Sequence, residues 1–184
     1  MNDLAMHILD IVQNSISAGA KRIEISVIIN LLKDLLSIII TDNGKGMSPE
    51  SVKKVTDPYY TSRTTRKVGL GIPLLKQTAM QTGGDVTITS ELGVGTTIQA
   101  DFGYSNIDRP PLGDLANAYV LLMSANPEIN MILNYIFNGE TYSVCTEDIK
   151  EALDGVPVND PAVTPLLNDM IQSNILELQS LDNN

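Results

Sequence analysis

The chain has 184 residues, of which 43% are hydrophobic, and it carries a formal net charge of −10 at pH 7. This length suits one large or two small domains with a buried core. The single cysteine, Cys145, excludes a disulfide framework and the cysteine spacing of a zinc site. No apolar run is long enough to cross a membrane and no signal-peptide pattern is visible, so we expect a cytoplasmic protein without membrane insertion.

An amphipathic helix is predicted over residues 4–18. Apolar positions recur there at helical spacing, and a second stripe of polar residues shares one face: His7, Asp10, Asn14 and Ser17. Asp10 and Asn14 are one helical turn apart, and a carboxylate beside an amide can hold a hydrated magnesium ion or a water. A helix with a solvated polar face explains the same pattern.

The run Asp42-Asn43-Gly44-Lys45-Gly46-Met47 follows an apolar segment, residues 35–40, that is predicted to be a buried strand. A carboxylate at the end of a buried strand needs a hydrogen-bond partner. The glycines after it allow a sharp turn and a close approach of the backbone to a ligand. Together they suit a flat heterocycle with an exocyclic amine, such as adenine, although a plain Asp-Asn-Gly turn has the same sequence.

Two further glycine-rich segments follow along the chain. Gly69 and Gly71 precede a predicted helix over residues 72–81, whose N-terminus offers backbone N–H groups and a positive dipole to an anion. The preceding loop, residues 61–67, is basic and rich in hydroxyl groups, as suits a polyphosphate. Residues 93–97 join two predicted strands, 85–90 and 97–102, and taken alone this segment favours a hairpin turn without a ligand.

The order and spacing of these four segments resemble the GHKL superfamily. Its members include the ATP-binding domains of sensor histidine kinases, anti-sigma kinases, DNA gyrase and mismatch-repair ATPases. The resemblance runs from Leu4 to Phe102, just over half of the chain. It implies an α/β fold, a Bergerat-type sandwich with helices on one face of a mixed, mainly antiparallel sheet. ATP and Mg²⁺ would lie between the helices and a lid, residues 48–68.

The resemblance also implies a role for each matching residue. Asn14 would ligate Mg²⁺, and Asp42 would accept a hydrogen bond from the adenine amine, with Thr96 joined to Asp42 through a water. The other implied nucleotide contacts are Gly44, Gly46 and Met47 near the base, Gly69, Leu70 and Gly71 near the phosphates, and Arg63, Arg66 or Lys67 in the lid.

Asp10 occupies a position, four residues before Asn14, at which ATP-hydrolysing members of the superfamily commonly have a glutamate as general base. Aspartate is shorter by one methylene, and lost reach weakens proton transfer. Asp10 is therefore expected to be either the base or a partner of the hydrated magnesium ion. His7 is expected to pack or hydrogen-bond rather than to be phosphorylated, because we expect the helical domain that carries a phosphoacceptor histidine to be absent.

Charge divides the chain into two parts. Residues 1–104 hold ten basic and ten acidic side chains, whereas residues 105–184 hold two basic and twelve acidic ones. Together with Pro110 and Pro111, this change predicts a nucleotide-binding domain over residues 1–104 and an acidic α+β C-terminal module over residues 105–184. A docking role is expected for the module, and its acidic character disfavours nucleic acid as a partner.

The C-terminal module is predicted to contain a short helix, a hairpin and two helices. The helix covers residues 114–124, and the strands 130–137 and 141–146 meet at Asn138-Gly139, a strong two-residue hairpin signal. Thr146 is predicted to cap a helix that ends near Leu153. The last helix, residues 161–178, has one apolar face that includes Leu166, Leu167, Met170, Ile171 and Ile175.

Three classes of function fit the sequence. The first is a protein kinase that transfers phosphate from Mg²⁺-ATP to another chain, of the histidine-kinase-like or anti-sigma kind. The second is a regulatory switch in which nucleotide changes lid order, with slow hydrolysis or none. The third, a mechanochemical ATPase that forms a homodimer on ATP, is disfavoured by the acidic second half. The sequence does not identify the protein partner.

Overall fold

The structure is a computed structural model that describes residues 3–57 and 70–183. The helices are α1 (Leu4–Ser17), α2 (Pro49–Thr56), α4 (Gly71–Gln81), α5 (Leu115–Ala125), α6 (Thr146–Leu153) and α7 (Thr164–Ser180), followed by the 3₁₀ turn η1 (Leu181–Asn183). The strands are β1 (Arg22–Asn30), β2 (Leu35–Asp42), β3 (Val86–Glu91), β4 (Gly95–Gly103), β5 (Asn130–Phe137) and β6 (Glu140–Cys145).

All six strands belong to one mixed sheet with the order β3-β4-β2-β1-β5-β6. Every neighbouring pair is antiparallel except β1 and β5, which run parallel from Arg22 opposite Asn130 to Ile29 opposite Phe137. The predicted α/β class with a mixed, mainly antiparallel sheet is confirmed. The sheet continues across the predicted boundary at residue 104. The division into two domains stays a prediction.

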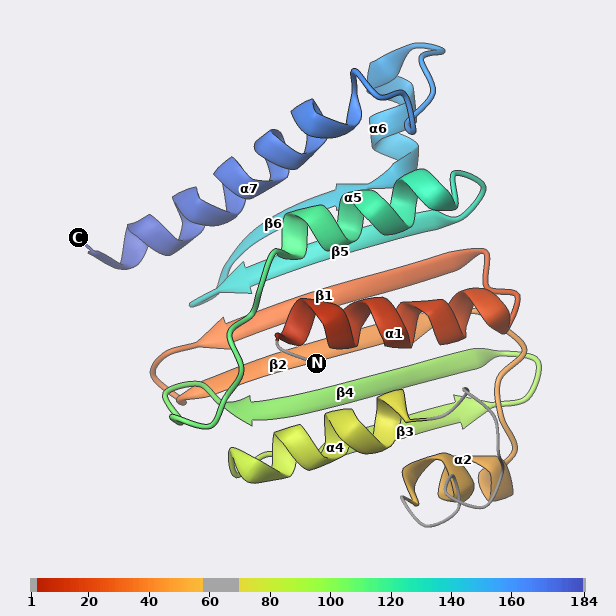
Figure 1. Ribbon diagram of the computed structural model, residues 1–184, viewed down its shortest axis with the longest axis vertical. Coiled ribbons are helices and arrows are strands. Elements are labelled where there is room, and N and C mark those ends of the chain that lie inside the picture. The colour runs from red at the N-terminus through yellow and green to blue at the C-terminus, as the bar shows by residue number, and fades with distance from the viewer. Residues whose placement is uncertain (1–2, 58–69, 184) are drawn as a thin grey trace.

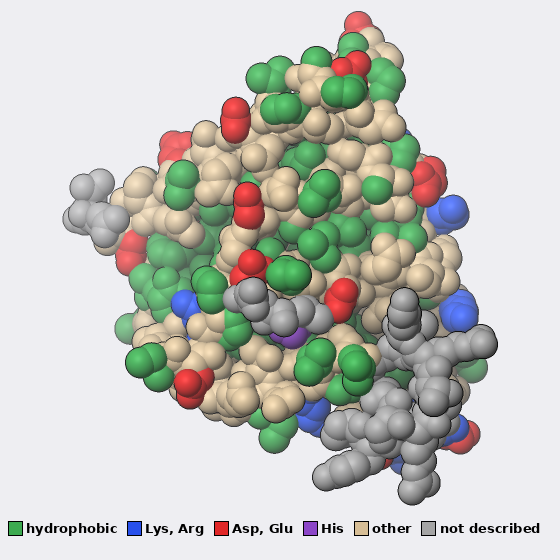
Figure 2. Space-filling view, in the orientation of Figure 1, with side chains coloured by type: hydrophobic (Ala, Val, Ile, Leu, Met, Phe, Trp, Pro, Cys, Tyr) green, Lys and Arg blue, Asp and Glu red, His purple; other side chains and the backbone are tan. Residues whose placement is uncertain are grey.

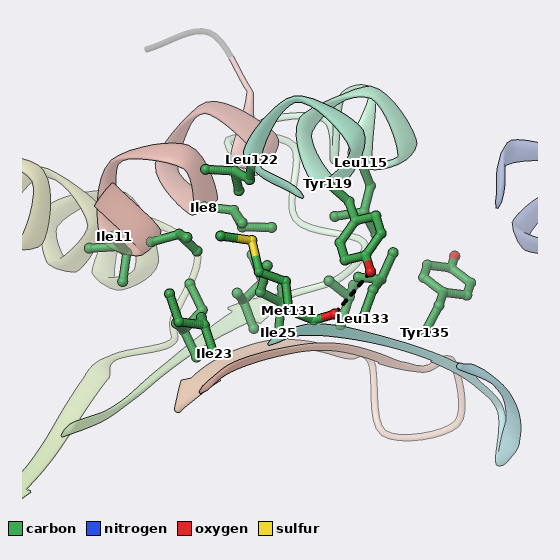
Figure 3. Packing of buried hydrophobic residues seen from close by; sticks show 14 of the residues in the cluster. Ile8, Ile11, Ile23, Ile25, Leu115, Tyr119, Leu122, Met131, Leu133 and Tyr135 are labelled. Carbon is green, nitrogen blue, oxygen red and sulfur yellow. Dashed lines mark hydrogen bonds between the residues drawn. The ribbon is translucent and has the colours of Figure 1, made fainter. Parts of the chain in front are cut away.

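Helices α1, α4, α5 and α7 lie on one face of the sheet (Figure 1). Alternate residues of the strands point to this face and are buried, as the burial pattern of β1 shows. Figure 3 shows Ile25 of β1 and Leu133 of β5 pointing toward Ile8 of α1 and Leu115 of α5. The predicted sandwich with helices on one face is therefore confirmed, and residues from both parts of the chain share its core.

The core contains one polar link that fixes α5 to the sheet. Tyr119 is 1% exposed, and its hydroxyl donates to the Met131 carbonyl oxygen at 2.9 Å (Figure 3). Burial raises the pKa of the Tyr119 hydroxyl, because the phenolate has no water around it. The bond satisfies a polar group that would otherwise be costly to bury.

Two local predictions are wrong in detail. Thr146 does not cap α6: it is buried, and its hydroxyl accepts from the Met131 N–H at 3.1 Å, while the Cys145 side chain lies at the N-cap. In α7, Leu167, Ile171 and Ile175 are buried, but Leu166 and Met170 are 68% and 41% exposed. The apolar residues of α7 are spread too widely around the helix for one packed face to cover all of them.

The turn chemistry of the module agrees with its sequence. Asn138 and Gly139 join β5 to β6 with φ angles of 48° and 91°, the left-handed values that favour these two residue types in a hairpin.

The expected lid contains a helix that the sequence analysis did not predict. This helix, α2, begins at Pro49 after the N-cap Ser48, whose hydroxyl accepts from the Ser51 N–H at 3.2 Å.

Candidate functional site

Asp42, the last residue of β2, is held by two hydrogen bonds from different segments. The Ser15 hydroxyl of α1 donates to Asp42 Oδ2 at 2.6 Å, and the Gly44 N–H donates to Asp42 Oδ1 at 2.8 Å. Ser15 is buried, whereas Asp42 is half-buried. Each carboxylate oxygen keeps a second lone pair, so Asp42 can still accept a hydrogen bond from an amine. This geometry fits the predicted role of Asp42 as the acceptor for adenine.

The glycines after Asp42 lie where the protein has no room for a side chain. A Cβ on Gly44 would lie 2.9 Å from the Cβ of Ala18. A Cβ on Gly46, which has a φ of +68°, would lie 1.9 Å from the Glu91 carbonyl oxygen. The segment is therefore clamped between the end of α1 and the β3–β4 hairpin. Internal packing is sufficient to require both glycines, and contact with a base stays a prediction.

Thr96 and Met47 come to the same edge of the sheet as Asp42. Thr96 lies opposite Asp42 in the pairing of β2 with β4. The Thr96 and Ser90 hydroxyls are 2.8 Å apart, and the Met47 N–H donates to the Ser90 hydroxyl at 2.8 Å. Ser90 therefore ties the segment after β2 to the hairpin that carries Thr96.

Asp10 lies against the first turn of α4. A Cβ on Gly71 would lie 3.4 Å from Asp10 Oδ2, so the carboxylate is in reach of the N-terminus of this helix. No side chain caps α4 within the described residues, which leaves its first N–H groups open to an anion. Asp10 and Asn14 are both exposed on α1, as their predicted roles toward phosphate and magnesium require. The structure thus brings the predicted base and the predicted phosphate-binding turn together.

The predicted lid contacts lie mostly outside the described residues. This applies to Arg63, Arg66, Lys67 and Gly69, whose roles stay predictions. Leu70 is described: it precedes α4 as its N-cap residue and is 62% exposed. Its predicted contact with nucleotide is not tested by this position.

His7 is 3% exposed, and its Nδ1 atom has no hydrogen-bond partner among the described residues. Burial lowers the pKa of His7, and the Asp10 and Asp3 carboxylates oppose this shift. A buried, neutral imidazole agrees with the packing role that the sequence predicts.

The model of the family described as histidine kinase-, DNA gyrase B- and HSP90-like ATPases matches residues 2–105. The chain belongs to this ATPase family. The family match covers α1 through β4, which includes every described residue of the candidate site.

Curated relatives carry the same domain within longer proteins. Histidine protein kinase DivJ of Caulobacter vibrioides is 30% identical over 95 residues, 50% of this chain and 16% of that protein. Sensor histidine kinase YvrG of Bacillus subtilis is 32% identical over 89 residues, 46% of this chain and 15% of that protein. The chain therefore matches less than a fifth of the length of either relative.

A solved structure shows that the likeness in fold extends past residue 105. The N-terminal domain of a DNA repair protein superposes with a TM-score of 0.56 and 18% sequence identity, over 78% of this chain and 52% of that chain. The family match covers a smaller share of the chain, residues 2–105, so part of the C-terminal segment superposes as well. At this identity the comparison concerns the fold alone.

Sequence reasoning missed three polar residues that position the site. Ser15 and Ser90 hold Asp42 and Met47, and the Asn43 side chain accepts from the Lys21 and Arg22 N–H groups at 2.8 and 2.9 Å. Asn43 thereby joins the turn after β2 to the start of β1. Two of these residues stand next to a predicted site residue, since Ser15 follows Asn14 and Asn43 follows Asp42. This position in the sequence does not reveal a hydrogen-bond partner that is distant along the chain.

Proposed function

We propose that the chain binds Mg²⁺-ATP at this site and transfers the γ-phosphate to another protein. The observation that carries the proposal is the Asp42 carboxylate, fixed by Ser15 and by the Gly44 N–H with acceptor capacity left for an amine. The curated relatives are named histidine kinases, which supports transfer to a protein. In this reaction the bond between the γ-phosphorus and the bridging oxygen breaks, a nucleophilic side chain of the second protein takes the phosphoryl group, and ADP leaves.

Asn14 is the residue that would hold the magnesium ion. Within the described residues, no cluster of three or more His, Cys, Asp and Glu side chains is arranged to bind a metal. One amide suits Mg²⁺ nevertheless, because this ion keeps several waters and takes its other ligands from substrate phosphates. Bound there, the ion would neutralise phosphate charge.

Asp10 is the residue best placed to accept a proton. Its carboxylate lies beside Gly71 at the open N-terminus of α4, where the phosphates would bind. The positive end of the α4 dipole would stabilise the negative charge of a phosphate bound at that place. Asp10 would take the proton of an attacking hydroxyl or water, with the reduced reach of an aspartate.

A nucleotide-dependent switch with slow hydrolysis is the second candidate. Asp10 receives no hydrogen bond from the described residues, whereas an efficient base is usually oriented by a neighbouring group. A poorly oriented base would leave ATP bound without rapid transfer. Binding would then act through the conformation of the lid.

The test uses ATP labelled at the γ-phosphate, with Mg²⁺, the full chain and a lysate of the source cell. Label on a second protein supports a kinase, provided that Asp42→Asn abolishes it. Asp108→Asn is the matched control, because Asp108 is exposed in the loop after β4, at the opposite end of β4 from Thr96. Binding without label transfer supports the switch, and absence of ATP binding refutes both candidates.

A further inference from the structure

The outer side of α7 and the start of η1 present apolar side chains that the described residues do not cover. Leu166, Met170 and Leu181 are 68%, 41% and 54% exposed. With Glu177 between Met170 and Leu181, these residues follow one another at intervals of four, seven and four positions, which places them on the same side of a helix. We call Leu166, Met170, Glu177 and Leu181 the outer stripe. It is separate from the buried residues Leu167, Ile171 and Ile175 that attach α7 to the fold.

The charged side chains of the segment that contains the outer stripe have one sign. Residues 151–184 contain six acidic side chains and no lysine or arginine, and three of the acidic ones, Asp169, Glu177 and Asp182, lie on α7 and η1. Figure 2 shows hydrophobic and acidic side chains over α7. The nearest basic residue along the chain, Lys150, donates to the Pro127 carbonyl oxygen, and the described residues contain no ion pair in this segment. The carboxylates near the stripe are therefore not neutralised by the chain itself.

The surface is formed before any partner arrives. The Gln179 side chain donates to the Tyr135 hydroxyl at 2.7 Å, and Asn138 donates to Asp182 Oδ1 at 2.9 Å. These bonds fix the C-terminal end of α7 to β5 and to the β5–β6 turn, while α5 packs along the helix. A partner would thus meet a rigid helix, and little ordering would oppose binding.

We infer that the outer stripe docks a basic amphipathic helix of another protein. The α7 helix is 17 residues long, which gives a contact roughly 25 Å long, matched by a partner helix of similar length. Apolar residues of the partner would cover Leu166 and Met170, and a lysine or arginine would face Glu177. A second copy of this chain does not fit, because each copy brings the same acidic residues and like charges repel.

This inference is independent of nucleotide binding. The described site residues lie on α1, the 42–47 segment, the start of α4 and β4. The outer stripe lies on α7 and the start of η1, and α7 packs against α5 and the β5–β6 edge of the sheet. ATP affinity should therefore be the same with and without the docked helix. Loss of docking and loss of ATP binding can be measured as separate failures.

The experiment measures fluorescence anisotropy of a labelled 18-residue peptide of lysine and leucine in amphipathic order, with the full chain at physiological salt. The double variant Leu166→Ser/Met170→Ser should weaken binding at least tenfold, and Glu177→Lys should weaken it several-fold. Leu32→Ser is the matched control, because Leu32 is 97% exposed in the β1–β2 turn. It should leave the affinity unchanged.

Three results would overturn the inference. The first is equal binding of a scrambled peptide of the same composition, which would mean that charge alone acts. The second is binding by the double variant and by Glu177→Lys, both shown to be folded by circular dichroism, as tight as that of the unmodified chain. The third is a dimer, seen in sedimentation, that the double variant loses, because a second copy would then be the occupant.

Discussion

The hydrogen bond from Ser15 to Asp42 makes Ser15→Ala a direct test of the nucleotide site. The substitution removes a donor 2.6 Å from a carboxylate at a position that is 4% exposed. A hydrogen bond to a charged group contributes about 1.5–3 kcal/mol, so the free energy of unfolding should fall by a value in that range. Asp42 also loses one of the two donors that fix its orientation, and the site becomes less preorganised for an amine.

This loss of orientation should be measurable as a change in affinity. We expect the Kd for ATP to rise roughly tenfold in Ser15→Ala, which corresponds to about 1.4 kcal/mol. Preference for ATP over GTP should fall as well, because guanine presents a carbonyl oxygen where adenine presents the amine that we propose donates a hydrogen bond to Asp42. Isothermal titration calorimetry with both nucleotides measures the affinities, and urea denaturation measures the stability.

Ser37→Ala is the matched control within the same sheet. The Ser37 hydroxyl donates to Asp101 Oδ1 at 2.5 Å, and Ser37 is 4% exposed, as Ser15 is. Its removal should lower stability by a similar amount without changing either affinity, because Asp101 lies away from Asp42 along the β2–β4 pair. Unchanged ATP affinity in Ser15→Ala, or an equal loss in Ser37→Ala, would refute the reasoning.

Three other outcomes are expected. Gly95→Ala should lower the unfolding free energy by more than about 3 kcal/mol, because a Cβ there would lie 1.9 Å from the Asp42 carbonyl oxygen. Gly93→Ala is the control, since a Cβ there meets nothing within 4 Å, and it should lower the unfolding free energy by about 1 kcal/mol. Urea denaturation measures both values. Burial lowers the pKa of His7, so below pH 6.5 the unfolded state binds more protons than the folded state does. The melting temperature should therefore fall on acidification, and it should fall less in His7→Leu than in the unmodified chain. Asp10→Asn should leave ATP affinity unchanged and slow phosphate transfer roughly 100-fold; full turnover in a radiometric assay would exclude Asp10 as the base.

The sequence predicts the helices and strands well wherever hydrophobic spacing is regular. The helix expected at residues 4–18 is α1, and the strand expected at 130–137 is β5. The order of the strands was not predictable in the same way. Parallel pairing of β5 with β1 joins segments far apart in the chain, and no local pattern encodes it.

Prediction of the candidate site depended on glycines and carboxylates at characteristic spacings. The structure brings Asp42, Thr96 and Met47 to one edge of the sheet, and Asp10 to Gly71. The serines that position them could not be predicted, because a serine has many polar neighbours in sequence and its partner is decided by packing. The error at Thr146 has the same cause, since its hydroxyl bonds to β5 instead of the helix that follows it.

The net charge of the chain changes near residue 104, and the match to the family model ends at residue 105. The hydrophobic core, in contrast, continues across this boundary. Buried residues of α1, β1, α5 and β5 form one cluster. Without β5, the strand β1 would become a sheet edge with unpaired backbone groups, and the side of α1 that meets α5 would lose its cover. The helix that carries Asp10, Asn14 and Ser15 is therefore held between α4 and α5. The acidic segment thus supports the candidate site by packing, even though none of the predicted site residues belongs to it.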